Sequence, residues 1–241
     1  MLKLYQFFRS GELLSVSPPC LKLETWLRMT GIQYENCPPD PSKSPKGKFP
    51  YIEDDELKLG DSTLIIEVLK QKYGKDPDAS LSTAERAISH AFRKMLEENF
   101  YWVIGYLRYK LDENWKVYRQ LVLDAVAPGL PIEKHEEMGE YIKSTVFSQL
   151  HSQGMGRHSP QEVAQIGIAD LRAIADYLGD KPYFMGARPT TADATVYAHV
   201  TSCIQGPGTD QVKTYGLSRS NLVEYCHRMR ERYFPDAPSK A

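Results

Sequence analysis

Segments with a β-strand pattern are confined to the first 60 residues, and this asymmetry limits the possible folds most strongly. Four short runs have a strand-like pattern, namely residues 3–8, 32–35, 51–53 and 57–59. Amphipathic segments at residues 18–30 and 62–73 separate or follow them, and Asp54-Asp55 provides an acidic turn between the last two. The order of strand, helix, strand, hairpin and helix predicts a small α/β domain with a mixed sheet over residues 1–75.

Both predicted helices of this domain have an apolar face. The face of the segment at residues 18–30 is predicted to carry Cys20, Leu23 and Leu27. Lys22 and Arg28 are expected to be more exposed, and Gly31 is expected to end the helix, as glycine commonly does just past a C-terminus. In the segment at residues 62–73, the side chains expected to face inward are Leu64, Ile65, Val68 and Leu69.

From Ser82 onward the sequence indicates helices only. Three helix starts place a hydroxyl three residues before a carboxylate, in Ser82-Thr83-Ala84-Glu85, Ser159-Pro160-Gln161-Glu162 and Thr190-Thr191-Ala192-Asp193. The first of these helices is expected to span 83–111, and further helical segments at 114–126, 133–152 and 218–233 bring the expected number of helices to five or six. We therefore predict an all-helical domain over residues 82–234. A polar linker precedes it near residues 74–81, and residues 235–241 are expected to be a frayed tail.

Composition argues against several classes of function. A net charge of −1 over 241 residues leaves no general surplus of Lys and Arg for binding nucleic acid. No run approaches the roughly 18 apolar residues that span a bilayer, and the first residues do not resemble a signal peptide, so we expect a cytoplasmic protein. The four cysteines form no Cys-x-x-Cys pair and the six histidines are dispersed. We therefore expect reduced thiols and no metal site.

The stretch Ser15-Val16-Ser17-Pro18-Pro19-Cys20 opens the first predicted helix, and Ser17 has two possible roles. A serine followed by proline in the first turn is typical of an ordinary N-cap. The hydroxyl would alternatively donate a hydrogen bond to a bound reactive group, and both roles hold if it switches partner. Ser15 is a second candidate donor. Cys20 lies on the apolar face, where burial makes a thiol inert.

Two further places in this domain offer backbone groups to a small acidic peptide. Lys46-Gly47-Lys48-Phe49-Pro50-Tyr51 precedes the third strand. Pro50 at the mouth of that strand is a candidate cis-proline, which would expose backbone N–H and C=O groups for strand-like hydrogen bonds. Gly60-Asp61-Ser62 opens another helix, whose free N–H groups and positive dipole end suit a carboxylate.

This order of features resembles the soluble glutathione transferases, and more closely their metaxin-like and failed-axon-connections-like branch. The closer resemblance rests on SPPCLKLETWLRM (residues 17–29), SPKGKFPYIE (44–53), ENFYWV (98–103), GMGRHS (154–159) and LGDKPYF (178–184). It spans nearly the whole chain. It implies the glutathione transferase fold, in which a thioredoxin-like domain precedes an all-α domain, and by analogy a homodimer.

The resemblance implies that the Ser17 side chain meets the sulfur of bound glutathione. As a hydrogen-bond donor, together with the helix dipole, this hydroxyl would lower the pKa of the thiol by roughly 2 units and make thiolate the main form at neutral pH. Pro19 departs from the family pattern, and a second proline in the first turn would change the direction of the hydroxyl.

The resemblance also implies which residues contact the other parts of glutathione. Lys48 would meet the glycine carboxylate, and the backbone of Phe49, before cis-Pro50, would pair with the cysteinyl part. Asp61 and Ser62 would hold the γ-glutamyl group.

The function implied is a glutathione transferase that adds the thiolate to a small electrophile bound in an apolar cleft between the domains. Trp102 and Tyr106 are candidates to line that cleft, although core packing explains most aromatic side chains in such a helix. Two alternatives remain: a metaxin-like interaction protein without turnover, and glutathione-dependent thiol exchange through Cys20. The presence of all the polar positions expected for glutathione favours a ligand-binding site.

Overall fold

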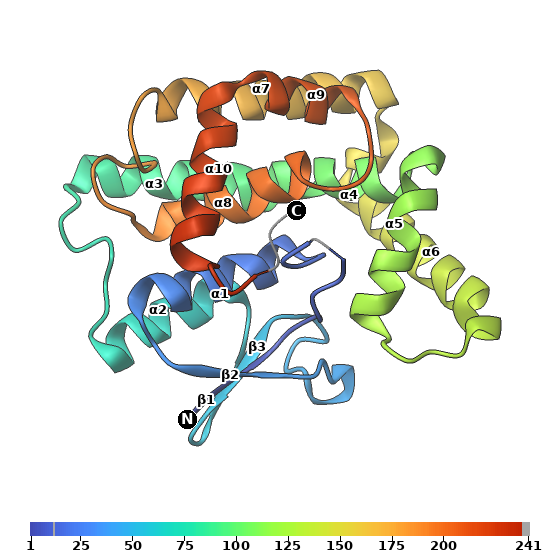
Figure 1. Ribbon diagram of the computed structural model, residues 1–241, viewed down its shortest axis with the longest axis horizontal. Helices are drawn as coiled ribbons and strands as arrows, with labels where there is room; N and C mark the ends of the chain where they lie inside the picture. Colours follow the sequence, from blue (N-terminus) through green and yellow to red (C-terminus); the bar gives the residue numbers. More distant parts are fainter. Residues whose placement is uncertain (12, 238–241) are drawn as a thin grey trace.

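The N-terminal domain contains the mixed sheet that the sequence predicts. The computed structural model describes residues 1–11 and 13–237 (Figure 1). Its strands are β1 (Leu2–Tyr5), β2 (Tyr34–Cys37), β3 (Tyr51–Asp54) and β4 (Leu57–Gly60), in the spatial order β2-β1-β3-β4. The β1–β2 pair is parallel, whereas β3 runs antiparallel to both β1 and β4. A short 3₁₀-helix, Pro41–Lys43, lies in the loop before β3.

Two helices, α1 (Pro18–Thr30) and α2 (Ser62–Tyr73), pack against the sheet through a shared apolar core. Ile52 of β3, Leu27 of α1 and Ile65 of α2 are all fully buried in it. Gly31 ends α1 in the left-handed conformation, with φ 68°, as predicted. The set of α2 side chains expected to face inward is wrong in part, because Leu64 and Val68 are 47% and 37% exposed. Besides Ile65 and Leu69, the apolar side chain that α2 buries is that of Ile66.

The regular elements of the C-terminal domain are all helices within its described residues. Its helices are α3 (Thr83–Lys94), α4 (Tyr101–Tyr109), α5 (Asp112–Val126), α6 (His135–Gln153), α7 (Pro160–Leu178), α8 (Thr191–Ile204), α9 (Gln211–Ser218) and α10 (Ser220–Tyr233). A π-helical segment, η2 (Met95–Phe100), joins α3 to α4. Short 3₁₀-helices occur at Ile132–Lys134 and Met155–Arg157. The sequence analysis missed α9, a helix of only eight residues.

All three predicted capping boxes are formed, at Ser82/Glu85, Ser159/Glu162 and Thr190/Asp193. The third is fully buried. The Asp193 carboxylate accepts hydrogen bonds from the Thr190 N–H (2.7 Å), the Phe184 N–H (2.7 Å) and the Tyr225 hydroxyl (3.0 Å). The box therefore fixes the start of α8, a helix whose residues are all buried.

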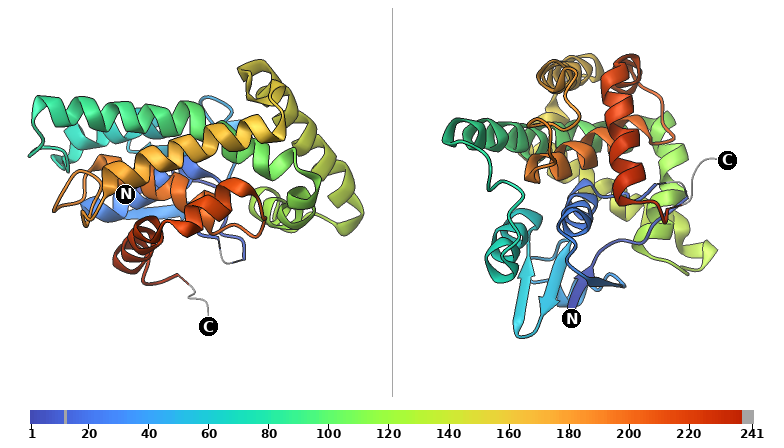
Figure 2. Two further views of the ribbon diagram at one scale, coloured as in Figure 1. Left: turned by 90° about the horizontal axis from the view of Figure 1, so that it is seen from above. Right: turned by 60° about the vertical axis from the view of Figure 1, so that its left-hand side comes forward.

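The two domains meet along α1, which lies between the sheet and the helical domain (Figure 1; Figure 2, right). The main contact is between α1 and α8. This second cover explains why the expected exposure of Lys22 is wrong, since its side chain is only 1% exposed. Its ammonium group forms an ion pair with Glu97 of η2 (2.5 Å) and donates to Thr63 Oγ1 of α2 (2.6 Å).

Asp170 of α7 is a buried carboxylate that gives a pH-dependent prediction. It is 9% exposed and accepts a hydrogen bond from Asn99 Nδ2 (2.7 Å). Burial raises the pKa of Asp170 to about 6, although the Asn99 hydrogen bond acts in the opposite direction. In the unfolded chain this pKa is about 3.9, so between about pH 4 and pH 6 the folded state binds more protons. Its contribution to stability therefore falls as the pH rises, and the full penalty is present above pH 6.

We expect Asp170→Asn to raise the free energy of unfolding at pH 7.5 by up to about 3 kcal/mol, the value of a shift of about 2 pKa units. At pH 3.5 the gain should almost disappear, because the carboxyl group is then mostly neutral in both states. Urea unfolding of both proteins at the two pH values measures this difference. An equal gain at both would show that ionisation is not the cause.

Candidate functional site

Strand register brings three loops to one end of the sheet. Tyr51 at the start of β3 pairs with Tyr5 at the end of β1 and with Gly60 at the end of β4. The segment after β1 leads to Ser17, the segment before β3 carries residues 48–50, and the segment after β4 is Asp61 and Ser62. The sequence-predicted positions therefore lie around one edge of the domain.

The first turns of α1 and α2 also lie together at this edge. Lys22 in the second turn of α1 donates to Thr63 in the first turn of α2 at 2.6 Å. Two helix N-termini, each carrying a partial positive charge, thus lie close together, although the N–H groups of their first turns are largely occupied by Ser17 and Asp61. Such a region favours anionic groups, including carboxylate and thiolate.

Ser17 is the N-cap of α1, with φ −116° and ψ 113°. Its Oγ accepts a hydrogen bond from the Cys20 N–H at 3.4 Å, which uses an oxygen lone pair and does not require the hydroxyl proton. Ser15 is 4% exposed and its Oγ accepts from the Ser17 N–H at 3.1 Å. Ser17, half-buried, is therefore the more accessible donor. Pro19 does not prevent the cap, because Leu21 N–H still bonds to the Ser17 carbonyl at 3.0 Å.

Cys20 is fully buried, as its place on the apolar face predicts. Burial raises the pKa of its thiol to about 12, against the lowering effect of hydrogen bonds with the Ser17 side chain and the Phe7 backbone. An inaccessible thiol with this pKa carries almost no thiolate at neutral pH. Thiol exchange through Cys20 therefore has no support in the structure. All four cysteines are free.

The loop before β3 carries Lys48, Phe49 and Pro50. Lys48 is exposed, and its backbone N–H and carbonyl both bond to Ser44 Oγ, at 3.0 Å and 2.6 Å. Phe49 is half-buried, its ring lies 5.0 Å from that of Phe7, and its peptide bond to the buried Pro50 is cis. Because Phe7 also contacts Cys20, this ring pair connects the loop to the beginning of α1.

Asp61 and Ser62 form the start of α2. The Asp61 carboxylate caps the helix by accepting from the N–H groups of Thr63 (2.9 Å) and Leu64 (3.1 Å). Asp61 has φ 87° and ψ 112°, a region that non-glycine residues rarely adopt and that costs about 1–3 kcal/mol. Strain of this kind is concentrated at ligand sites. Ser62, at the first helical position, is 8% exposed.

The aromatic residues proposed for the second substrate point away from this edge. Tyr106 is 2% exposed and its hydroxyl donates to the His158 carbonyl at 3.2 Å, so its placement does not favour a role in the cleft. Trp102 is half-buried and packs on the helical core. Two other residues of α4 face the beginning of α1. Arg108 donates to the Val16 carbonyl, and the hydroxyl of Tyr101 is within electrostatic reach of Cys20.

Sequence analysis did not single out Arg108. A helical wheel offers a signal for it, because Arg108 follows Tyr101 by seven residues, close to two helical turns. The two side chains therefore share a helix face. Nothing in the sequence, however, identifies that face as the one covering the loop before Ser17.

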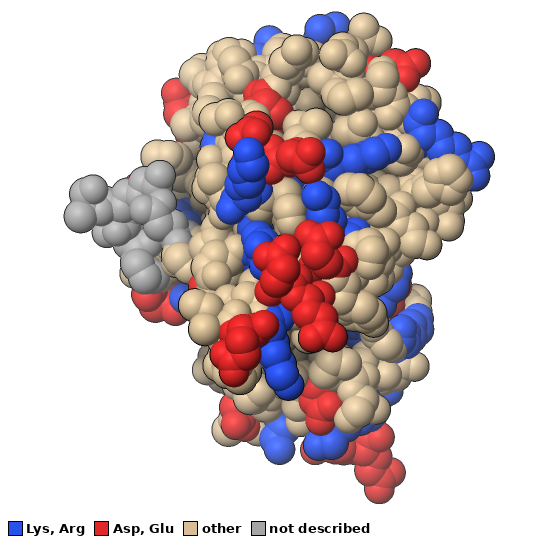
Figure 3. Space-filling view, turned by 90° about the vertical axis from the view of Figure 1, so that its right-hand side faces the viewer, with Lys and Arg blue, Asp and Glu red and all other residues tan. Residues whose placement is uncertain are grey.

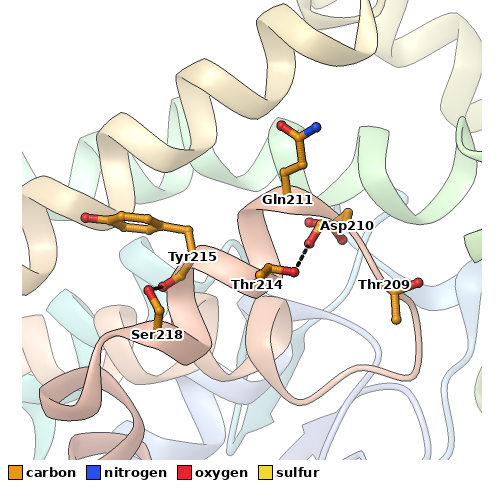
Figure 4. Close-up of a pocket in the computed structure, with 6 residues that line it drawn as sticks. All are labelled: Thr209, Asp210, Gln211, Thr214, Tyr215 and Ser218. Atoms are coloured by element: carbon orange, nitrogen blue, oxygen red, sulfur yellow. Dashed lines mark hydrogen bonds between the residues drawn. The ribbon is translucent and has the colours of Figure 1, made fainter.

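Three hollows of the structure lie elsewhere. One, of about 530 Å³, is an open hollow beside α9 lined by Thr209, Asp210, Gln211, Thr214, Tyr215 and Ser218 (Figure 4). A second, of about 500 Å³, lies between the end of α1 and α10. A third, of about 10 Å³, is beside Arg108. None of these three is lined by the sequence-predicted residues. Near Ser17, the side chains of Leu13 and Val16 pack against Tyr118 and Ala125 of α5.

On the face formed largely by α5 and α6, basic and acidic side chains are interleaved and form no large patch of one charge (Figure 3). Ion pairs such as Lys143–Asp112 (3.1 Å) and Arg119–Glu136 (2.6 Å) join these helices to each other. Within residues 1–11 and 13–237, no helix is both long and apolar enough to cross a membrane, and no three metal-binding side chains form a group.

Comparisons with known proteins identify the family. Residues 18–115 match the glutathione S-transferase N-terminal domain, and residues 167–229 match the glutathione S-transferase C-terminal domain. An isoprene-epoxide glutathione S-transferase of Rhodococcus sp. (strain AD45) is 32% identical over 97% of this chain and 99% of its own length. The chain therefore belongs to the glutathione S-transferase family.

Other relatives carry different names. Failed axon connections of Drosophila melanogaster is 34% identical over 98% of this chain, which spans 59% of that protein. Metaxin-2 of Mus musculus is 24% identical over 97% of this chain and 89% of its own length. The structure of glutathione transferase F2 from Populus trichocarpa superposes with a TM-score of 0.61, at 16% identity over 96% of this chain and 94% of that one. That likeness supports the fold alone.

Proposed function

We propose that the protein binds glutathione at the edge of its N-terminal domain and adds the thiolate to a small electrophile. The observation that carries this proposal is the convergence of two helix N-termini with the Phe49–Pro50 segment at one end of the sheet. Ser17 would donate a hydrogen bond from its hydroxyl group to the glutathione sulfur. Asp61 and Ser62 would hold the γ-glutamyl group.

The remaining contacts of the tripeptide follow the same edge. The exposed ammonium group of Lys48 would meet the glycine carboxylate, since it has no ion-pair partner within the described residues. The backbone of Phe49, next to Pro50, would pair with the cysteinyl part by strand-like hydrogen bonds. Each part of the ligand would thus be bound by a different segment of the chain.

The electrophile in this proposal is a small epoxide, the class named by the Rhodococcus relative. Bound glutathione first loses its thiol proton to solvent. The thiolate then attacks an epoxide carbon, the ring C–O bond breaks, and the resulting alkoxide takes a proton from water. Tyr101, half-buried on α4 and close to the beginning of α1, replaces Trp102 and Tyr106 as the proposed contact to this substrate.

Millimolar glutathione is expected to raise the melting temperature of the protein by about 5–10 °C. A ligand at 100 times its Kd stabilises the folded state by about 2.7 kcal/mol, and each kcal/mol shifts the melting temperature of a chain of this size by about 2–4 °C. Differential scanning fluorimetry of the wild type and of Ser62→Ala measures the shift and its dependence on the site. A wild-type protein that is not stabilised at all would rule out the glutathione proposal.

The second candidate function is that of an interaction protein without turnover. It is favoured by the packing of Leu13 and Val16 against α5, which narrows the space beside Ser17, and by the similarity to metaxins and failed axon connections. The thermal-shift result separates the two, because only the transferase requires glutathione binding.

For either function we propose a cytoplasmic homodimer, with the exposed Leu64 and Val68 of α2 in its interface.

A further inference from the structure

Arg108 of α4 is a buried cation without a carboxylate partner. It is 4% exposed, and its two hydrogen bonds go to backbone carbonyls, those of Val16 (Nη1, 2.6 Å) and Ser202 (Nη2, 2.8 Å). Its Nε has no hydrogen-bond partner, and no Asp or Glu in the described residues lies within 4.0 Å of it. A buried charge is ordinarily paired with an opposite one; Asp210 lines the same small hollow as Arg108 but forms no ion pair with it, so the positive charge of Arg108 has no direct partner in the described residues.

The carbonyl that Arg108 binds belongs to the peptide group just before Ser17. The N–H of the same peptide group, that of Ser17, donates to Ser15 Oγ at 3.1 Å. Both polar atoms of the Val16–Ser17 peptide are therefore fixed, the oxygen by the helical domain and the nitrogen by the loop. Because a peptide group is planar, fixing both atoms sets the position of the Ser17 Cα, and the hydrogen bond from the Cys20 N–H then holds the Ser17 Oγ.

Arg108 is itself held rigidly. Ser202, whose carbonyl it binds, lies in the fully buried α8, and the guanidinium lies 5.0 Å from the centre of the Tyr118 ring. The hollow beside it has a volume of about 10 Å³, room for about one water molecule. Little solvent is thus available to screen its charge.

The charge of Arg108 also reaches the beginning of α1. Burial raises the pKa of Tyr101, ionisation of Cys20 would raise it further, and the charge of Arg108 lowers it. Tyr101 thus lies within the influence both of Arg108 and of the first turn of α1. A thiolate bound next to Ser17 would occupy the same neighbourhood.

We propose that Arg108 is a positioning residue of the glutathione site: it fixes the Val16–Ser17 peptide so that the Ser17 hydroxyl meets the sulfur, and its unpaired charge favours the ionised thiol. This inference rests on the proposed function and extends it. The helical domain, which would bind the electrophile, would also set how much of the bound glutathione is thiolate.

The test compares Arg108→Gln, which retains one hydrogen-bond donor but no charge, with Arg108→Lys, which retains the charge on a single nitrogen. The thiol of bound glutathione is titrated by its thiolate absorbance in the ultraviolet with each protein saturated. We expect its pKa to rise by about 1 unit in Arg108→Gln and by about half a unit in Arg108→Lys. Turnover at pH 6.5 should fall about tenfold in Arg108→Gln, with the KM for the electrophile within about twofold, and should recover at pH 9.

The matched control is Arg93→Gln, which neutralises another buried arginine of the helical domain, one whose ion pair is with Glu67 of α2 (3.9 Å) and not with the loop before Ser17. Its bound thiol should titrate as in the wild type. An unchanged thiol pKa in a folded Arg108→Gln would overturn the proposal, as would a loss of turnover that persists at pH 9. Should Arg108→Gln fail to fold, an unchanged pKa in Arg108→Lys would overturn it equally.

Failure of the proposed function is distinguishable from failure of this inference. If wild-type protein binds no glutathione, the function and the inference both fall. If the wild type binds and ionises glutathione but the Arg108 variants titrate as it does, only the role of Arg108 is wrong.

Discussion

Ser17→Ala is expected to lower the turnover number of glutathione conjugation at least tenfold while leaving the fold intact. Without the hydroxyl donor the bound thiol returns toward its free pKa of about 8.5, so less of it is thiolate at neutral pH. A tenfold loss corresponds to about 1.4 kcal/mol of transition-state stabilisation. Loss of the N-cap hydrogen bond costs about 1 kcal/mol of stability, which circular dichroism and thermal unfolding will register separately. The measurement is kcat with a small epoxide between pH 6 and pH 9.

Three variants serve as controls for Ser17→Ala. Ser17→Thr keeps both a hydroxyl and a favoured N-cap, and should retain most of the activity. Cys20→Ala should retain it as well, because that thiol is buried and protonated. If instead Ser17→Ala is fully active and Ser15→Ala is not, the donor is Ser15 and the assignment of Ser17 is wrong.

Lys22→Met is expected to lower the free energy of unfolding by about 3 kcal/mol, the largest loss of stability that we predict. Removing one member of a buried ion pair leaves the other charge without its partner, which typically costs 3–5 kcal/mol. Burial raises the pKa of Glu97, but the attraction of Lys22 outweighs this and the pKa is lowered overall. The expected cost is at the lower end of the range because Lys94 Nζ lies 3.4 Å from the same carboxylate. Urea unfolding at pH 7 measures it.

The double variant Lys22→Met/Glu97→Gln shows whether charge is the cause. With neither charge present, most of the lost stability should return, leaving the protein within about 1 kcal/mol of the wild type. The hydrogen bond between Lys22 and Thr63 is lost in both variants and cancels from their comparison. If the double variant is as unstable as the single one, the packing of the Lys22 side chain, and not its charge, is what holds the domains together.

The order of elements and their ends could be predicted from sequence because they depend on neighbours along the chain. The capping boxes at Ser82, Ser159 and Thr190 involve residues three apart, and Gly31 needs only its own left-handed conformation. The same locality explains why the starts of α1 and α2 were placed well. The short α9 was missed because eight residues give too little periodicity to recognise.

Exposure, by contrast, depends on what covers an element from outside. The sequence pattern predicts that Lys22 lies on the exposed side of an amphipathic helix. It is nevertheless buried, because α8 covers the side of α1 that the sheet leaves open. The sequence pattern likewise predicts that Leu64 and Val68 lie in the core, yet both are exposed. The side of α2 that packs on the sheet carries Ile65, Ile66 and Leu69 instead. No local pattern distinguishes these outcomes.

What the sequence by itself determined is the family, the two-part architecture and the residues around one end of the sheet, because motifs and caps are encoded in adjacent positions. Only the tertiary structure decided that Lys22 and Tyr106 are buried away from solvent, and that Arg108, 92 positions from Val16, fixes the peptide before Ser17. The physical reason is that hydrogen bonds across the domain interface, and the burial that strengthens them, exist only once the helices of the second domain have packed onto α1.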